Sequence, residues 1–395
     1  MKFLQTMPCR VSSYESASEG YNITQQYLIA FNDVCNGGQN ILIPAGYTDY
    51  IGSFLYIPFI SRLFDIAISS STILFFFSYG LICIILSLIG LYKFYNTTYA
   101  KIYGTICILF LGIFFIAVSD TYSFYGLTSL CLLTWWSKMV NKNIFFSKKN
   151  IIFFIFTGII IGFSNSVRGN SGNDILLSII IIYFINFFLK KNFKSIGIVV
   201  LVVLPIIFFS LFIENIKNSS KKYLINNTDI LNYKIDLNYV RAHWHNAYYS
   251  LGFLNGKNNK DVPEPSDTYS VKKAHSINPD IVPYSKEYER LLKNEYFNFV
   301  KKYPYFFIKS KFAKIGVILF YIVVFFNIGL YFLYKKKCSN VNLLFFIPGI
   351  ILNSLFGIAT EPNYTYLLGL FAYCSIFSTN LIDDFFTKTK KLQIH

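Results

Sequence analysis

The chain has 395 residues, of which 54% are hydrophobic, 19% aromatic and only 14% charged. Soluble domains carry about 25% charged residues, so this composition excludes a soluble cytosolic enzyme, a disordered chain, a collagen and a small disulfide scaffold. The net charge of +16 does not indicate a nucleic-acid partner, because the basic residues cluster at the ends of apolar runs, where they meet lipid head groups. The sequence predicts an all-α polytopic membrane protein.

Residues 1–70 contain no apolar run long enough to cross a bilayer, which takes about 20 residues in a helix. The segment Ile51–Phe64 is apolar but short, so we predict an interfacial or re-entrant helix there. Cys9 and Cys35 can pair if this segment faces an oxidising compartment. We interpret residues 1–70 as an extracytoplasmic first loop.

Nine membrane helices are predicted after residue 70, because the apolar runs are continuous and lack the period of two that barrel strands show. The predicted spans are Ser71–Tyr95, Tyr99–Ser119, Tyr122–Val140, Asn150–Val167, Ile175–Leu189, Ser195–Phe212, Phe312–Tyr334, Asn342–Ile358 and Tyr364–Leu381. Residues 71–214 hold the first six spans, and residues 308–395 hold the last three with a tail. Residues 215–307 form a large loop between them.

Every second short connection between these spans is rich in lysine, with clusters at Lys93–Lys101, Lys138–Lys149, Lys190–Lys194, Lys335–Lys337 and Lys388–Lys391. Short basic loops stay in the cytoplasm, so these ends and the C-terminus are predicted to be cytoplasmic. The large loop, residues 1–70, Asp120, Arg168 and Glu361 are then extracytoplasmic. With a cytoplasmic C-terminus, nine spans also place the N-terminus outside. Because Met1–Tyr50 shows no signal peptide that would carry it there, we expect that an original first helix is missing before Met1.

Two charged residues mark turns on the predicted outer face. Asp120 joins two apolar runs with almost no loop, so it either caps the following helix or holds a carboxylate at the membrane surface. Arg168 lies in a turn with two glycines and either anchors to a lipid phosphate or holds a phosphorylated substrate with its planar guanidinium. Both interpretations of each residue stay open.

The large loop combines histidines, aromatic residues and an amphipathic helix. His243 and His245 flank Trp244, and Ser285 is predicted to cap a helix that runs to Val300. Such a mixed polar and aromatic surface suits sugar binding, and it would equally cap a helix bundle. The two histidines lack a nearby acidic or cysteine partner in sequence, so we predict no metal site.

Several function classes are excluded by missing motifs. No Walker loop, GxGxxG, HExxH or GxSxG occurs in a suitable context, which removes most ATP-driven, Rossmann and hydrolase functions. The predicted helices also lack the internal charge pairs that are usual in ion-coupled carriers.

The order of motifs resembles the GT-C superfamily of polytopic glycosyltransferases, most strongly a related group of bacterial membrane proteins, which implies a place in a bacterial cytoplasmic membrane. The resemblance is carried by Trp244-His245, Leu251-Gly252, Asp267, Glu287-Tyr288-Glu289 and Lys302-Tyr303-Pro304. It implies a GT-C-like bundle that moves a sugar, with inversion, from a polyprenyl-phosphate donor to an extracytoplasmic glycan, lipid or protein acceptor. No cofactor is indicated, although a divalent cation is compatible with such a site.

The resemblance also implies roles for single residues. Either Glu19 or Asp120 would act as general base on the acceptor. Glu19 precedes Gly20-Tyr21 but lacks the usual acidic neighbour, because Ser18 stands there. The residues implied to bind the lipid phosphate or the substrate are Arg168, His243, Trp244, His245, Asp267 and Glu361.

Two alternatives remain. An O-antigen ligase or polymerase also carries one large outer loop, and His245-Asn246 followed by Gly256 partly matches its loop motif. The other alternative is a non-enzymatic flippase for lipid-linked sugars.

Overall fold

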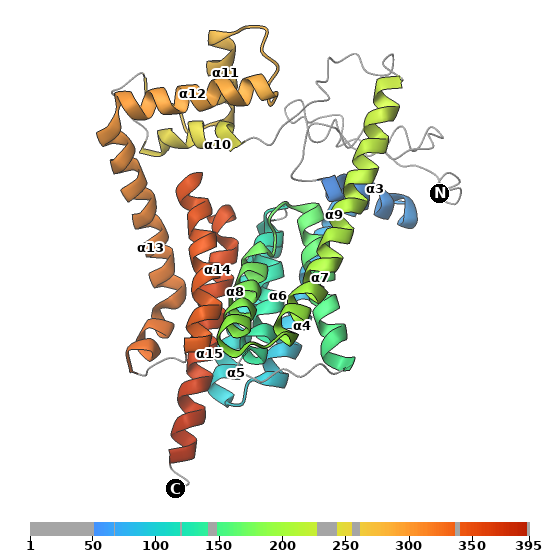
Figure 1. The fold of residues 1–395 in the computed structure, drawn as a ribbon, viewed down its shortest axis with the longest axis vertical. Coiled ribbons are helices and arrows are strands. Elements are labelled where there is room, and N and C mark those ends of the chain that lie inside the picture. The colour runs from blue at the N-terminus through green and yellow to red at the C-terminus, as the bar shows by residue number, and fades with distance from the viewer. Residues whose placement is uncertain are drawn as a thin grey trace.

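A computed structural model of the chain describes residues 51–66, 68–118, 121–140, 148–226, 243–254, 261–335 and 340–392. Within these ranges the protein consists of thirteen α-helices and two 3-10 helices, with no strand (Figure 1). The prediction of an all-helical protein is confirmed for this part of the chain.

Ten α-helices form a bundle, and three more lie across one end of it (Figure 1). The bundle helices are α3 (Ile51–Phe64), α4 (Ile68–Phe94), α5 (Thr98–Val118), α6 (Ser123–Met139), α7 (Lys148–Val167), α8 (Asn173–Lys190), α9 (Lys194–Asn226), α13 (Pro304–Lys335), α14 (Asn340–Ala359) and α15 (Leu368–Leu392), with η4 (Tyr364–Leu367) before α15. The elements across the end are α10 (His243–Tyr249), η3 (Ser250–Leu254), α11 (Asp267–Ile277) and α12 (Lys286–Lys302). We call these four elements the cap.

Seven of the described helices are long and apolar enough to cross a membrane, which indicates a multi-pass integral membrane protein. They are α4, α5, α7, α9, α13, α14 and α15. Seven of the nine predicted spans are thus confirmed as candidate spans. The other two predicted spans are helical, but α6 has only 17 residues and the apolar part of α8, Asn173–Leu189, is also short.

The reason for the difference is clearest in α6. This helix is buried by other helices along nearly all of its length, so its surface does not have to match lipid tails. It therefore carries Ser129, Thr134 and Lys138 among its buried side chains, which lower its hydropathy. Protein rather than lipid surrounds this helix, which is why it is less apolar than the spans that expose large apolar side chains.

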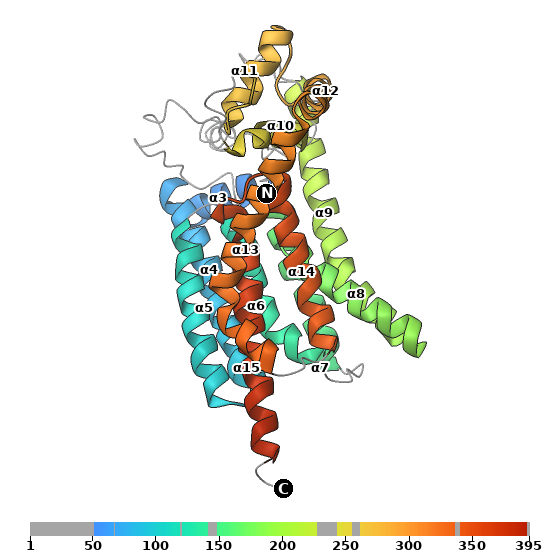
Figure 2. The same ribbon diagram turned by 90° about the vertical axis from the view of Figure 1, so that its left-hand side faces the viewer.

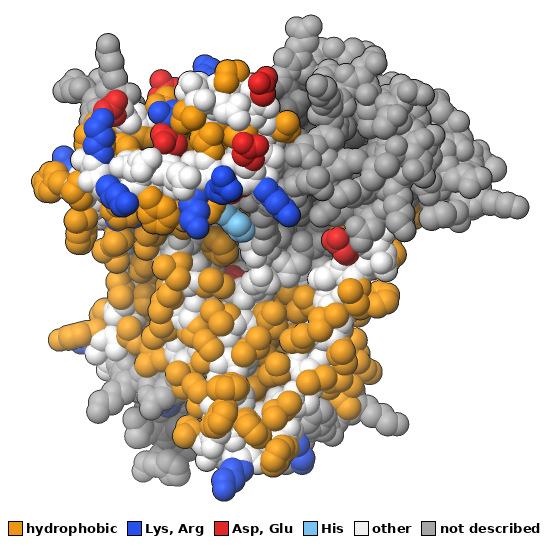
Figure 3. Space-filling model, turned by 45° about the horizontal axis from the view of Figure 1, so that its top comes forward, with side chains coloured by type: hydrophobic (Ala, Val, Ile, Leu, Met, Phe, Trp, Pro, Cys, Tyr) orange, Lys and Arg blue, Asp and Glu red, His pale blue; other side chains and the backbone are white. Residues whose placement is uncertain are grey.

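The surface of the bundle has the pattern of a membrane protein. Figure 3 shows acidic and basic side chains gathered on the cap, a flank of hydrophobic side chains below it, and basic side chains again at the far end. Large apolar residues such as Ile113, Phe208 and Phe312 are exposed on α5, α9 and α13. An apolar surface of this extent fits contact with lipid tails.

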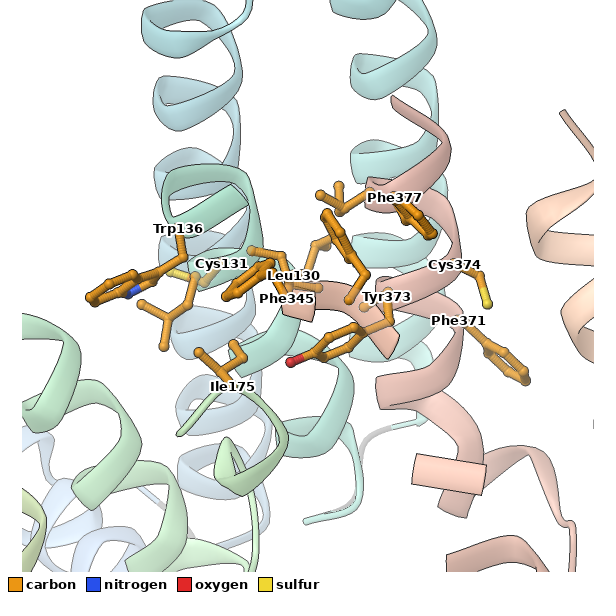
Figure 4. Close-up of a cluster of buried hydrophobic side chains, with 14 of the residues drawn as sticks. Leu130, Cys131, Trp136, Ile175, Phe345, Phe371, Tyr373, Cys374 and Phe377 are labelled. Atoms are coloured by element: carbon orange, nitrogen blue, oxygen red, sulfur yellow. The ribbon is translucent and has the colours of Figure 1, made fainter. Parts of the chain in front are cut away.

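The core of the bundle is built around α15, which is almost entirely buried. Trp136 of α6, Ile175 of α8, Phe345 of α14 and Tyr373 of α15 meet there (Figure 4). Gly349 permits this packing, because a Cβ atom at that position would lie 2.1 Å from Cε1 of Tyr373.

The connections between the helices alternate between the two ends of the bundle, as the lysine pattern predicts. The α4–α5 turn, the α8–α9 turn and the C-terminal end of α15 point away from the cap, whereas the α7–α8 turn and the α14–α15 connection lie at the cap end (Figures 1 and 2). We call these the opposite end and the cap end. The cytoplasmic location of the opposite end stays a prediction. Helix α3 has the predicted bounds and packs against α4 and α7, and its interfacial placement also stays a prediction.

One sequence inference about the helices is wrong. Lys138 of α6 lies 2.9 Å from Asp383 and 3.0 Å from Asp384 of α15, so the bundle does contain an internal charge cluster. Asp383 is fully buried and also accepts hydrogen bonds from the backbone nitrogens of Asn96 and Thr97, just before α5. The partners come from helices far apart in sequence, which is why spacing within single helices does not reveal the cluster.

Candidate functional site

The cap is organised around α12, the amphipathic helix predicted from the sequence. Ser285 caps it as predicted, since its side chain accepts a hydrogen bond from the Tyr288 nitrogen at 3.1 Å. Tyr288, Leu292 and Phe299 are buried on its inner face. Gly252 of η3 packs so closely on the backbone of Pro263 that a Cβ atom would lie 1.9 Å from the Pro263 carbonyl oxygen.

The carboxylate of Glu289 holds the beginning of α10. Glu289 is 6% exposed, and its Oε2 and Oε1 atoms accept hydrogen bonds from the backbone nitrogens of Trp244 at 2.7 Å and His245 at 3.1 Å. Backbone N–H groups at a helix start lack partners within the helix, and a negative charge there is favoured by the helix dipole. The Trp244-His245 and Glu287-Tyr288-Glu289 motifs are thus parts of one structural unit.

His245 lies inside this unit rather than on an open surface. The residue is 2% exposed, and its Nδ1 atom lies 2.6 Å from the Tyr288 hydroxyl. The rings of Tyr249, Tyr284 and Tyr288 lie at 5.9, 5.1 and 5.9 Å from the imidazole. Its backbone carbonyl accepts a hydrogen bond from Ser270 of α11 at 3.3 Å.

The other predicted loop residues have different surroundings. Trp244 is half-buried, with Tyr296 and Phe297 at 5.6 and 5.5 Å and the Lys293 ammonium 5.5 Å from its ring. His243 is exposed at the first position of α10. Asp267 begins α11, but its side chain lies outside the described part of the structure, as do Glu19 and Asp120 altogether.

Arg168 is buried at the cap end of the bundle, against a group of tyrosines. Its guanidinium carbon lies 3.9 Å from the centre of the Tyr122 ring, and its Nε atom donates to the Tyr125 hydroxyl at 3.3 Å. The Tyr125 hydroxyl in turn donates to the carbonyl of Gly169 at 3.0 Å. Arg168 is 5% exposed, so Tyr122 and Tyr125 hold this cation in a fixed orientation.

A series of tyrosines joins this arginine to the cap. The Tyr122 hydroxyl donates to that of Tyr366 in η4 at 3.0 Å, and Tyr366 is hydrogen-bonded to Tyr249 of α10. The Tyr249 ring is one of the three tyrosine rings that pack around His245. We call Tyr122, Tyr125, Tyr249 and Tyr366 the tyrosine cluster; it connects two of the residues that the sequence singled out.

The carbonyl groups at the C-terminal end of α14 and just after it accept hydrogen bonds from the cap and from α13. Lys311 of α13 donates to the carbonyl of Ile358 at 2.9 Å, Ser250 of η3 donates to that of Ala359 at 3.2 Å, and Lys314 of α13 donates to that of Thr360. Terminal carbonyls of a helix lack intrahelical donors and attract positive charge. Glu361, which is half-buried, follows directly and is a charged neighbour of Lys314.

A buried carboxylate lies inside the bundle near the same end. Asp174, in the first turn of α8, is 6% exposed and accepts hydrogen bonds from the Ser129 hydroxyl at 2.7 Å and from Nδ2 of Asn353 at 3.0 Å. These three side chains come from α8, α6 and α14. The sequence placed Asp174 in the Arg168 turn but gave no sign of its burial.

An exposed ion pair on the cap has shifted pKa values. Hydrogen bonds from the Lys302 ammonium, at 2.6 Å, and from the Tyr303 hydroxyl hold the pKa of Asp261 below its ordinary value. The same bond to Asp261 raises the pKa of Lys302 to about 12. The contribution of Asp261 to stability is lost as pH falls through its lowered pKa, and that of Lys302 is lost above about pH 12, so neither changes near neutral pH.

The structure thus divides the predicted site residues into two groups. Trp244 and His245 belong to the cap, and Arg168 lies at the end of the bundle, with the tyrosine cluster between them. The sequence analysis did not single out Tyr122, Tyr125 or Tyr366. The available signal was that Tyr122 and Tyr125 both lie at the start of a predicted helix, close to Asp120. Among the described residues, no group of three His, Cys, Asp or Glu side chains is placed to hold a metal ion.

Comparisons of the chain with protein-family models, curated protein sequences and solved structures found no match. The fold itself defines a helical membrane protein with seven candidate spans and a helical cap, and the function is inferred from the site.

Proposed function

We propose that this protein is a GT-C-like membrane glycosyltransferase, which transfers a sugar from a polyprenyl-phosphate donor to an acceptor on the cap side of the membrane. The observation that carries the proposal is the buried guanidinium of Arg168, stacked 3.9 Å from the Tyr122 ring at the cap end of the bundle. A phosphate attached to a lipid reaches a protein at this depth, where a span meets its polar surroundings.

The chemistry of Arg168 suits a phosphate. A guanidinium presents its donors in a planar fork that matches phosphate oxygens, and partial burial strengthens the attraction. Tyr122 and Tyr125 hold the guanidinium in place through its face and its Nε atom, so the charge is positioned before a ligand arrives. A leaving phosphate that develops negative charge is stabilised by such a fixed cation.

The cap supplies surfaces of the kind that sugars need. Half-buried Trp244 and exposed Phe297 lie side by side on α10 and α12, beside the Lys293 ammonium. Aromatic faces stack on sugar rings, and polar groups hold their hydroxyls. His243, Asp267 and Glu361 are proposed as further substrate contacts, and Glu19 or Asp120 as the general base that activates the acceptor hydroxyl. A divalent cation stays compatible with this proposal.

The test is transfer from a radiolabelled decaprenyl-phosphate sugar, measured with protein reconstituted in vesicles. We expect Arg168→Leu to lower the rate at least 100-fold, since it removes a charge-assisted contact to the phosphate, and Arg168→Lys to lower it less. Asp120→Asn and Glu19→Gln are tested in parallel, and loss of transfer in one of them identifies the base.

The matched control is Arg290→Leu, which removes an exposed arginine from α12. It should transfer like the wild type. The proposal is wrong if Arg168→Leu retains full activity. It is also wrong if the folded wild-type protein transfers no sugar from any lipid-phosphate donor and binds decaprenol and decaprenyl phosphate equally.

A further inference from the structure

The outer face of α12 carries one exposed aromatic side chain. Phe297 is 44% exposed, whereas Leu292 and Phe299 on the inner face of the same helix are buried. Its ring centre lies 5.5 Å from that of Trp244 in α10, which is half-buried. Trp244 and Phe297 thus form a small aromatic surface on the outside of the cap, which we call the aromatic pair.

Two exposed lysines lie on either side of Phe297. Lys293 precedes it by four residues and Lys301 follows it by four, and residues with this spacing are neighbours on a helix surface. Each lysine is about 6 Å from Phe297 along the helix axis, in opposite directions. The Lys293 ammonium also lies 5.5 Å from the centre of the Trp244 ring. Figure 3 shows basic and hydrophobic side chains next to one another on the cap.

The acidic residues of α12 do not neutralise these lysines. The buried carboxylate of Glu289 binds the start of α10, and that of Glu295 lies 3.4 Å from the Lys273 ammonium of α11. The remaining acidic residue of the helix, Glu287, is ten residues before Phe297, in the first turn. The surroundings of Phe297 on α12 are therefore positively charged.

Lys293 and Lys301 differ in this respect from other lysines of the cap. Lys302, the next residue in the chain, lies 2.6 Å from the carboxylate of Asp261. Among the described residues, Lys293 and Lys301 have no carboxylate partner. An apolar ligand would use only the aromatic pair, and a small inorganic anion would use only the ammonium groups. A sugar ring that carries a carboxylate uses both.

We propose that the aromatic pair and its two lysines bind an acidic sugar, which is a unit of the acceptor glycan. The sugar ring stacks on Phe297 and Trp244, and its carboxylate binds the ammonium of Lys293 or Lys301. A second acidic unit of the same glycan binds the other lysine. The inference rests on the proposed function only in assigning this glycan as the acceptor, because the binding surface itself is described by the contacts above.

The test measures binding of trigalacturonate, an acidic trisaccharide, and of the neutral maltotriose to the whole protein in nanodiscs of phosphatidylcholine. We expect trigalacturonate to bind about 5- to 10-fold more tightly, because exposed ion pairs each contribute a small amount. High salt should remove this preference. The double variant Lys293→Gln/Lys301→Gln should bind both sugars alike, and Phe297→Ala should weaken the binding of both.

The matched control is Lys272→Gln/Lys286→Gln, which removes the same charge from two exposed positions of α11 and α12 away from Phe297. It should keep the wild-type preference. Hydrogen exchange of the peptide that contains Trp244 verifies that the cap of each variant is folded.

The inference is overturned if the wild type binds trigalacturonate no more tightly than maltotriose, or if the Lys293→Gln/Lys301→Gln variant keeps the preference. Equally tight binding of triglutamate, which has no sugar ring, would also overturn it. Arg168→Leu should bind trigalacturonate like the wild type. Preferential binding of trigalacturonate without any sugar transfer would therefore refute the transferase and leave the acidic-sugar surface standing.

Discussion

The buried carboxylate of Glu289 lies 2.7 Å from the backbone nitrogen of Trp244, across 45 residues of sequence. Together with the bond to the His245 nitrogen, this contact joins α12 to the start of α10. The cap therefore holds its shape through a charge-assisted contact between two segments that the sequence shows as separate motifs.

Glu289→Ala should leave two buried N–H groups without an acceptor and lower the stability of the cap by about 2–3 kcal/mol. Hydrogen exchange followed by mass spectrometry measures this effect as faster exchange of the peptide that contains Trp244 and His245. The control is Glu287→Ala, since Glu287 is exposed on the same helix, and it should change stability by less than about 0.5 kcal/mol. Equal exchange in both variants would contradict the capping role.

Gly252→Ala should destabilise the cap, because the new Cβ atom would lie 1.9 Å from the Pro263 carbonyl oxygen and the backbone would have to move. Overpacking of this kind costs about 1–3 kcal/mol. The matched control is Gly316→Ala in α13, where no atom lies within 4 Å of the added Cβ. That change should instead stabilise the helix by about 0.5–1 kcal/mol. Thermal unfolding in detergent separates the two, and a Gly252→Ala variant as stable as the wild type would refute the close approach.

Lys138→Met should unfold the opposite end of the bundle at a lower temperature. It leaves Asp383 and Asp384 without their ammonium partner, and loss of one member of a buried ion pair costs about 3–5 kcal/mol. Adding Asp383→Asn to Lys138→Met should recover part of the loss. Lys388→Met, at an exposed position near the end of α15, is the control and should melt like the wild type. Additive effects in the double variant would show that the two side chains do not interact.

The orientation of the bundle follows from the lysine pattern and is tested by labelling. Single cysteines replace Lys286 on the cap and Lys388 near the end of α15, both exposed, in a chain whose native cysteines are changed to serine. A membrane-impermeant maleimide added to intact cells should label position 286 and spare position 388. The reverse result would place the cap and Arg168 in the cytoplasm and remove the basis for an extracytoplasmic site.

The positions of the membrane helices could be predicted from the sequence because hydropathy acts locally. A run of apolar residues bounded by lysines is sufficient to locate α4, α5 and α13, and the capped amphipathic pattern located α12. Which of these helices lipid surrounds and which protein surrounds could not be predicted in the same way. Whether an apolar helix such as α6 faces lipid or protein depends on its neighbours, and no local pattern records them.

In the candidate site too, some residues could be predicted from the local sequence, whereas their partners could not. Arg168, Trp244 and His245 stand out in the sequence as rare polar or aromatic residues at predicted turns and loops. Their partners do not, because Tyr122, Glu289 and Tyr366 are ordinary residue types in helices or turns far away. The sequence therefore indicated which residues to examine, and it left open whether each one binds a ligand or holds the cap together.

Composition and hydropathy alone determined that the chain is a helical membrane protein with basic connections at alternate ends, since lipid excludes charged side chains and backbone groups that lack hydrogen bonds. Only the tertiary structure decided which polar groups meet inside it. Asp174 with Asn353, Lys138 with Asp383, and Glu289 with Trp244 are contacts between distant segments, and their energies depend on distances that arise only when the helices pack.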